Sequence, residues 1–315
     1  MIPEMTIFPE VCGRMFSAAI PQVPSSDCTG RTLKTTEALF ALFSTSQAVL
    51  LTPLVEHYGL TESQQGMPNA VVNIGCALAL LTSLFENEVD YILGAAVNGA
   101  TSRFTIETAE RFAGYYAAVG IHPQNCGEYT DIEAALYEIE ALAKSPKVKA
   151  IGEIGYDFYW EDNPSPEVQK AYFEGQMEIA RRLKLPVIIH DREAHGATMD
   201  MILKYPDVIG VLHSYSGSIE MAKELVKRGW YISFSGVITY KNATRLAEVV
   251  PTIPKDRILV ETDCPYLSPV PMRGKRNDSA NVKYTAAKAA ELRGEGYDDF
   301  CRQTTENAKR LFGIA

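Results

Sequence analysis

Short apolar runs alternate with longer segments of helical periodicity from about residue 89 to the end of the chain. Each short run is rich in branched or aromatic residues and predicts a buried strand. Strands that alternate with helices pair in parallel, and strands this apolar are covered on both faces. The predicted strands are 90–97, 115–121, 148–154, 185–190, 208–213, 230–235 and 257–262.

The segments between the strands predict amphipathic helices, most clearly at 131–144 and 166–184. The second of these repeats apolar residues along one side, which we expect to face the sheet. These apolar positions are Ala171, Phe173, Met177 and Ala180.

Seven strands leave two α/β folds open. A closed (β/α)₈ barrel needs one further strand before residue 89, whereas a doubly wound open sheet tolerates seven. The first 80 residues lack the strand–helix rhythm: the apolar stretches 38–51 and 70–81 are compatible with helices, and "QAVLL" is compatible with a strand.

Composition limits the class of protein. The 315 residues are 46% apolar and 22% charged, which is typical of an ordered chain with one large α/β barrel or two smaller domains. The net charge, 30 − 39 = −9, does not fit a protein that coats nucleic acid, although it allows an enzyme with a local basic patch. Six cysteines without a C-x-x-C pair, no membrane-length apolar run and no secretory signal indicate a cytoplasmic protein.

Histidines and acids collect where the predicted strands end. His122, His190 and His213 each follow or end a strand, Glu153 lies in the strand 148–154, and Asp263 follows the last strand. Parallel strands bring their carboxyl ends to one rim, so these side chains are expected to meet there. Imidazole and carboxylate ligands bind Zn or Mn, and Mg takes the oxygens. The pattern therefore predicts metal-assisted hydrolysis, with one or two divalent ions per chain.

Six motifs together resemble the TatD family of metal-dependent hydrolases and deoxyribonucleases over about residues 86–315. The resemblance implies a TIM (β/α)₈ barrel whose first strand is missing or atypical, preceded by an unassigned segment, 1–85. The motifs are "GIHPQ" (120–124), "AIGEIGYDFYW" (150–160), "LPVIIHDREA" (185–194), "VLHSYSGS" (211–218), "WYISFSGVI" (230–238) and "ILVETDCPYLSPVPMRGKRND" (258–278).

The resemblance also implies roles for the acids and histidines. Glu153 in "GEIGYD" is similar to a metal-bridging carboxylate, and His190 and His213 are similar to ligands of one metal. Asp263 in "ETDCPYL" is similar to the acid that serves the other metal and activates water. Asp263 and Glu153 are therefore the expected catalytic residues. Glu261 is expected only to support the residues beside it.

Substrate contacts are expected from basic residues near the same rim. His122 and Arg192 are phosphate-contacting candidates. Arg276 lies in "RGKRND" (273–278), which is either a loop that contacts backbone phosphates or a solvated turn. His195 does not end a strand and is expected on a helix surface.

One motif of the family is missing. Most relatives begin with a strand ending in His-x-His, and this sequence contains no His-x-His. Counting back from the strand 90–97 places the first strand's end near residues 55–66, where His57 is present and Gly59 takes the second histidine's place. Otherwise, the first strand is absent or residues 1–80 are unrelated to the barrel.

Three functions follow from these features. The first is a divalent-metal-dependent deoxyribonuclease, a 3′–5′ exonuclease by family resemblance, acting as a monomer on DNA or a small phosphoester with Mg, Mn or Zn. The second is a barrel with half a metal site that acts as a binding protein. The third is an amidohydrolase acting on C–N bonds; such enzymes use a lysine on the fourth strand, but Lys149 lies too early and Glu153 stands there instead.

Overall fold

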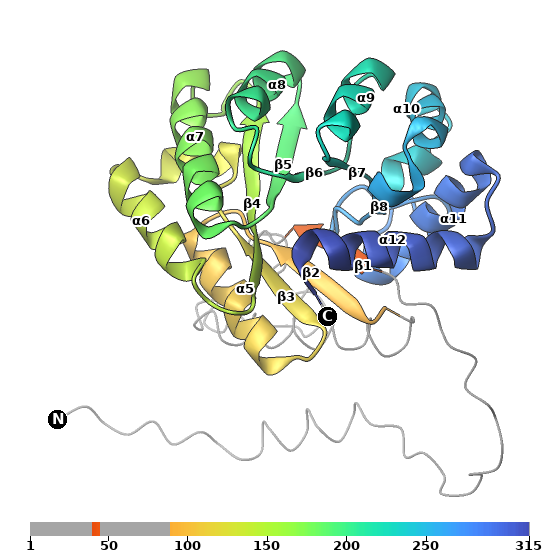
Figure 1. Cartoon of the computed structure of the whole chain (residues 1–315), viewed down its shortest axis with the longest axis horizontal. Coiled ribbons are helices and arrows are strands. Elements are labelled where there is room, and N and C mark those ends of the chain that lie inside the picture. Colours follow the sequence, from red (N-terminus) through yellow and green to blue (C-terminus); the bar gives the residue numbers. More distant parts are fainter. Residues whose placement is uncertain (1–39, 45–88, 315) are drawn as a thin grey trace, which may run out of the picture. The chain divides into compact units, whose positions relative to one another are not determined.

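The computed structural model of the chain describes residues 40–44 and 89–314 (Figure 1). The chain divides into two units, 1–36 and 37–315, and the first unit lies outside the described residues. None of the described helices is long and apolar enough to cross a membrane.

In the described part of the chain, eight parallel strands form one sheet in sequence order, with helices around it (Figure 1). β1 also contacts β8, so the first and last strands of the sheet meet as in a TIM barrel. The barrel prediction is confirmed, and all seven strands predicted beyond residue 89 are present. The strands are β1 Phe40–Ser44, β2 Tyr91–Ala95, β3 Tyr115–Val119, β4 Val148–Asp157, β5 Val187–Arg192, β6 Gly210–Leu212, β7 Tyr231–Phe234 and β8 Ile258–Val260.

The helices follow the strands along the chain, as the alternating pattern predicts. Both segments expected to be helices form them, and the structure adds six more among the described residues. The helices are α5 Gly99–Arg111, α6 Ile132–Leu142, α7 Pro166–Leu183, α8 His195–Lys204, α9 Ile219–Lys227, α10 Thr244–Val249, α11 Val282–Arg293 and α12 Tyr297–Phe312.

Local sequence explains why α7 begins and ends where it does. Ser165 caps its first turn by accepting a hydrogen bond from the Val168 N–H, and Pro166 occupies the first helical position, where a missing N–H costs nothing. The helix ends at Leu183, and the capping residue Lys184 has a φ of 55°, in the left-handed region. Phe173, Met177 and Ala180 face the core as predicted.

The prediction for Ala171 is wrong, because this residue is exposed. Tyr172 and Phe173, the next two residues, are buried instead. The helix turns by about 100° per residue, so Ala171 lies outside the stripe that reaches the strands.

Strand side chains alternate between two apolar clusters, as the two-residue period of a strand requires. In β2, Ile92 packs in the cluster that includes helix residues such as Met177, so it faces the helices. Its neighbour Leu93 packs in the other cluster with Ala150 and Ile188 from β4 and β5, on the inner side of the curved sheet. Burial on both sides leaves only the strand ends free to carry polar chemistry.

The first strand differs from the sequence prediction. β1 is Phe40–Ser44, and it pairs with β2 from Phe40 opposite Tyr91 to Ser44 opposite Ala95. The predicted position near residues 55–66 is therefore wrong; His57 and Gly59 lie outside the described residues. Because β1 belongs to the sheet, residues 40–44 are part of the barrel, and the domain boundary at 85/86 stays a prediction.

Candidate metal centre

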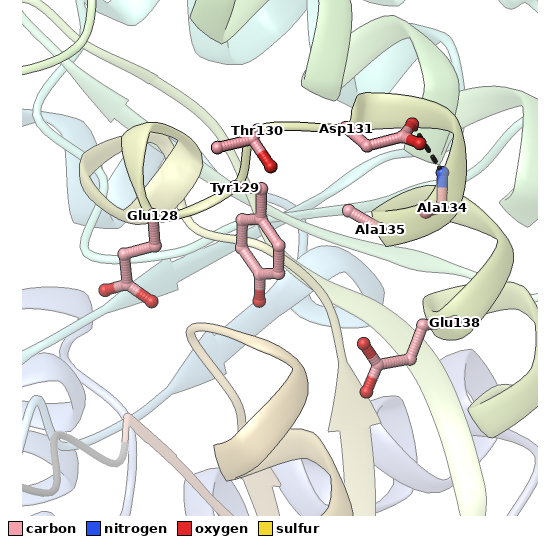
Figure 2. A pocket seen from close by; sticks show the side chains of 7 residues that line it. All are labelled: Glu128, Tyr129, Thr130, Asp131, Ala134, Ala135 and Glu138. Atoms are coloured by element: carbon pink, nitrogen blue, oxygen red, sulfur yellow. Dashed lines mark hydrogen bonds between the residues drawn. The ribbon is translucent and has the colours of Figure 1, made fainter.

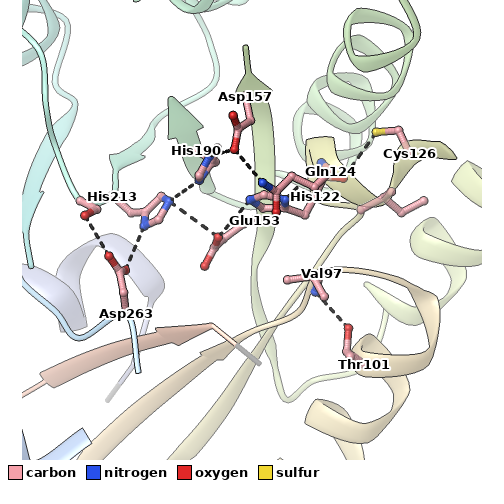
Figure 3. A network of polar contacts seen from close by, with 12 residues as sticks. Val97, Thr101, His122, Gln124, Cys126, Glu153, Asp157, His190, His213 and Asp263 are labelled. Atoms are coloured by element: carbon pink, nitrogen blue, oxygen red, sulfur yellow. Dashed lines mark hydrogen bonds and ion pairs between the residues drawn. The ribbon is translucent and has the colours of Figure 1, made fainter. Parts of the chain in front are cut away.

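Six polar side chains meet at the carboxyl ends of β3, β4, β5, β6 and β8. Figure 3 shows five of them: His122, Glu153, His190, His213 and Asp263. The six form two groups of three whose potential ligand atoms lie within 4.8 Å of one another in each group. This rim carries the active site in TIM-barrel enzymes. The first group is His122, Glu153 and His190, and the second is His213, Glu261 and Asp263.

The first group centres on the buried carboxylate of Glu153. His122 Nε2 lies 3.7 Å from Glu153 Oε2, and the His122 and His190 rings lie 4.4 Å apart, edge to face. His122 Nδ1 accepts a hydrogen bond from the Gln124 N–H at 3.3 Å. A neutral imidazole that accepts at Nδ1 carries its proton on Nε2, so His122 presents a donor to the centre.

The second group centres on His213. Its Nδ1 lies 3.3 Å from Glu261 Oε1 and 3.6 Å from Asp263 Oδ1. Ser214 holds both carboxylates: its N–H donates to Glu261 Oε1 at 2.5 Å and its hydroxyl donates to Asp263 Oδ2 at 2.9 Å. Ser214 makes these two bonds at a φ of 42°, a left-handed conformation that favours glycine.

Glu153 and the histidines join the two groups. Glu153 Oε2 lies 3.6 Å from His213 Nε2, and the same His213 atom lies 3.0 Å from His190 Nδ1. Figure 3 shows Glu153 between His122 on one side and His213 on the other. The structure thus brings all four predicted metal-ligand residues together, with Glu153 in the middle.

Burial and mutual charge shift the ionisation of the centre. Burial raises the pKa of Glu153, although His213 and His190 oppose the shift. Burial also raises the pKa of Glu261, with His213 opposing it. Burial alone would raise the pKa of Asp263, but hydrogen bonding and attraction to His213, with the Ser214 hydroxyl, lower it below its usual value.

The histidines shift in opposite directions. Burial and the charges of His190 and His213 hold the pKa of His122 well below its usual value. Burial alone would lower the pKa of His213, but Glu153, Asp263 and Glu261 raise it well above that value. His122 is therefore neutral, whereas His213 balances part of the negative charge around it.

The donor set fits a divalent ion. Three carboxylates and three imidazoles, all buried or partly buried, lie in two adjoining groups, and a divalent cation would offset the repulsion between the carboxylates. Glu261 Oε2 is buried without a hydrogen-bond partner. Nitrogen and oxygen donors in this combination suit Zn or Mn, and the carboxylates suit Mg.

Sequence reasoning missed the part played by Asp157, the last residue of β4. Asp157 Oδ2 lies 3.4 Å from His190 Nε2 and accepts a hydrogen bond from Gln124 Nε2 at 2.9 Å. A carboxylate behind a histidine sets the orientation and tautomer of the ring. The sequence signal for Asp157 is its place at the end of "GEIGYD", four residues after Glu153. The alternation of side chains along a strand does not predict that Asp157 contacts β5.

The other predicted residues lie farther out. Arg192 is exposed at the end of β5, with its guanidinium 4.0 Å from the Tyr159 ring centre. Arg276 is exposed in the segment 273–278. His195 begins α8, as expected of a helix residue, and bonds Asp191 Oδ2 through Nδ1 at 2.8 Å.

A separate hollow lies beside α6 and the 3₁₀ helix Pro123–Glu128 (Figure 2). Its polar side chains are acidic or hydroxyl-bearing, and it contains none of the six residues of the centre. Its lining residues are Glu128, Tyr129, Thr130, Asp131, Ala134, Ala135 and Glu138.

Comparison with known proteins identifies the family of the chain. The family model described as TatD related DNase matches residues 70–313. The chain belongs to the TatD family. It is 40% identical to the uncharacterized metal-dependent hydrolase YabD of Bacillus subtilis over 232 residues, 72% of this chain and 89% of YabD.

Two further TatD-family proteins extend the comparison. The chain is 36% identical to the 3′-5′ ssDNA/RNA exonuclease TatD of Citrobacter koseri, over 75% of this chain and 92% of that protein. The crystal structure of the TatD homologue YJJV from Escherichia coli superposes with a TM-score of 0.75 at 24% identity, covering 89% of this chain and all of YJJV. The structural match supports the barrel fold of this metal-dependent hydrolase family.

Proposed function

We propose that the chain is a divalent-metal-dependent nuclease that removes nucleotides from the 3′ end of single-stranded DNA. The observation that carries this proposal is the position of Glu153, which lies 3.7 Å from His122 and 3.6 Å from His213. The family description and the name of the Citrobacter relative support the substrate class.

Each residue has a role that follows from its position. Glu153, His190 and His213 would hold one ion, and Glu153 and Asp263 would serve a second. A divalent ion supplies Lewis acidity, which lowers the pKa of bound water and offsets phosphoryl charge. Asp263 is held as a carboxylate by Ser214 and His213, so it is prepared to orient water and accept its proton.

The substrate contacts follow from the donors around the centre. The neutral His122 offers its Nε2–H rather than a lone pair, which suits a phosphate oxygen better than a metal ion. Arg192 and Arg276 are exposed, and they supply positive charge for the part of the DNA strand that leads away from the metal centre. The cytoplasmic location and the monomeric state stay predictions.

A second candidate function rests on the first strand. β1 reads "FALFS" and has no histidine in the position where relatives carry His-x-His. A barrel that has lost part of its metal site and its activity would bind its substrate without cleaving it. The amidohydrolase alternative has weaker support, because the Lys149 side chain does not lie in the metal centre. Its Nζ lies over the Tyr116 ring instead, 5.8 Å from the ring centroid.

The test is cleavage of a 5′-labelled single-stranded oligonucleotide with Mg, Mn or Zn, compared with EDTA. We expect metal-dependent shortening from the 3′ end, which a blocked 3′ terminus prevents. His190→Ala should lower the rate by more than about 100-fold, since even the outer partners of a ligand are worth 10–100-fold. His195→Ala is the matched control and should leave the rate unchanged. Equal cleavage by wild type and His190→Ala would refute the nuclease.

Bound metal per chain separates the two candidate functions. Two ions per chain, measured by mass spectrometry after reconstitution, favour the nuclease with a complete ligand set. One ion that supports cleavage favours a one-metal nuclease, and one ion without cleavage favours the binding protein.

A further inference from the structure

Three consecutive aromatic residues project from the rim directly after β4, the strand that carries Glu153. Phe158, Tyr159 and Trp160 are 37%, 50% and 52% exposed. A single exposed aromatic side chain is common, but a group of them on one surface marks a site of interaction. The metal centre does not include them.

Arg192 joins this group from the end of β5. Its guanidinium carbon lies 4.0 Å from the Tyr159 ring centre and 5.3 Å from the Trp160 ring centre. The Tyr159 and Trp160 rings lie 4.7 Å apart at an interplanar angle of 89°. We call Tyr159, Trp160 and Arg192 the aromatic shelf; it combines ring faces with a positive charge.

A hydrogen bond and a carboxylate–histidine contact link the aromatic shelf to the metal centre. The Tyr159 N–H donates to Asp157 Oδ1 at 3.0 Å, and the other oxygen of Asp157 lies 3.4 Å from His190 Nε2. The Phe158 N–H donates to the Arg192 carbonyl at 2.9 Å, which ties the loop after β4 to the end of β5. The shelf is therefore held at a set position beside the predicted ligand His190.

We propose that the aromatic shelf stacks unpaired bases of single-stranded nucleic acid whose backbone enters the metal centre. This proposal rests on the proposed function and deepens it. Aromatic faces stack on any base, because every base has a π-face, and Arg192 adds attraction for the adjoining phosphate. A duplex hides its base faces, so the shelf favours single strands and is tolerant of sequence.

Positive charge and position favour nucleic acid over a protein partner. Arg192 places a cation among the rings on a chain whose net charge is −9, so the charge is local to the rim. Asp157 links the shelf directly to the side chains that would bind the ion. An occupant of the shelf therefore lies next to the reacting bond, which suits a substrate.

The test uses the two tryptophans of the chain. Trp230 is 2% exposed, so quenching by a ligand reports on Trp160. The probes are a twelve-residue oligothymidylate and an abasic strand of the same length, both with phosphorothioate linkages that slow cleavage, in Mg²⁺. We expect oligothymidylate to quench the fluorescence and to bind about tenfold more tightly than the abasic strand.

Variants locate the effect. Trp160→Ala and Tyr159→Ala should each weaken oligothymidylate binding, measured by anisotropy, by about tenfold while leaving abasic-strand binding unchanged. Trp160→Phe keeps an aromatic face and should retain most of the affinity. Tyr137→Ala, at an α6 residue that is 75% exposed, is the control and should bind both strands like wild type.

Equal affinity of wild type for oligothymidylate and the abasic strand, or unaltered oligothymidylate binding by Trp160→Ala, would overturn the proposal that the aromatic shelf stacks bases. Either result is expected if the shelf binds a protein partner instead. Cleavage of natural oligonucleotides separates the two proposals. If wild type and Trp160→Ala cleave with the same KM, the shelf is wrong and the nuclease stands. If binding depends on bases and Trp160 but no metal produces cleavage, the nuclease is wrong and the shelf stands.

Discussion

His213 shows how one side chain depends on the charges around it. Glu153, Glu261 and Asp263 all lie within 3.6 Å of its ring nitrogens, and their charges raise its pKa despite the burial that would lower it. Without an ion, the imidazolium proton supplies positive charge that offsets these three carboxylates. A divalent ion and this proton therefore compete for the same place.

Proton release on metal binding is the prediction that follows. A metal ligand must be a neutral imidazole, whereas a raised pKa keeps His213 protonated from its usual value of about 6.5 up to the raised one. Metal affinity should therefore rise with pH through this window, with about one proton released per ion. Calorimetry at pH 7.5 in two buffers of different ionisation enthalpy measures the release.

His195→Ala is the control for proton release and should behave like wild type, because His195 lies outside the centre on α8. Identical apparent binding enthalpies in the two buffers would show that His213 is already neutral.

At the scale of an element, α7 positions the rim through two buried glutamines seven residues apart. Gln176 accepts from the Ile121 N–H at 2.7 Å and donates to the Ile121 carbonyl at 3.0 Å, just before His122. Gln169 does the same for Asp157, at 2.9 and 3.0 Å. One face of α7 thus provides hydrogen-bond partners for the backbone N–H and C=O groups at the carboxyl ends of β3 and β4, next to the site.

Replacing Gln176 by leucine tests this support. Gln176→Leu leaves the buried Ile121 N–H and carbonyl without these partners, which should lower the free energy of unfolding by about 2 kcal/mol. Urea denaturation measures the loss. Lys170→Leu, at an exposed position of the same helix, is the control and should change stability by less than about 0.5 kcal/mol. Equal stabilities of the two variants would contradict the role of Gln176.

For the whole molecule, β1 determines whether the sheet has open edges. It pairs with β2 and contacts β8, so it lies between the first and last strands of the segment beyond residue 89. Removing it would leave unpaired backbone groups on both strands, which is a site of association between chains.

Two deletions test the closure. Removal of residues 1–36 takes away only the first unit and should leave the melting temperature nearly unchanged. Removal of residues 1–44 also takes away β1 and should lower the melting temperature by several degrees, since each kcal/mol is worth about 2–4 °C at this size. Size-exclusion chromatography should show association only of the shorter chain. Equal melting temperatures would mean that β1 does not close the barrel.

Most of the barrel was predictable because its signals are local. A strand buried on both faces needs a continuous apolar run, and such runs located β2 to β8 within a few residues. β1 was not located, since "FALFS" lies in a longer apolar stretch, 38–51, that fits a helix equally well. Ala171 was misplaced because a helical stripe has a width that spacing alone does not define.

The metal centre divides in the same way between sequence and structure. The position of His190, His213, Glu153 and Asp263 at one rim could be predicted from the sequence, because parallel strands bring their carboxyl ends together whatever the details of packing. Their roles as metal ligands come from the family resemblance and stay predictions. Three features required the tertiary structure: the hydrogen bond from Gln124 to His122 Nδ1, the contact of Asp157 with His190, and the stacking of Arg192 on Tyr159. Each depends on distances between side chains of different strands, which are set by barrel curvature and register rather than by residue type.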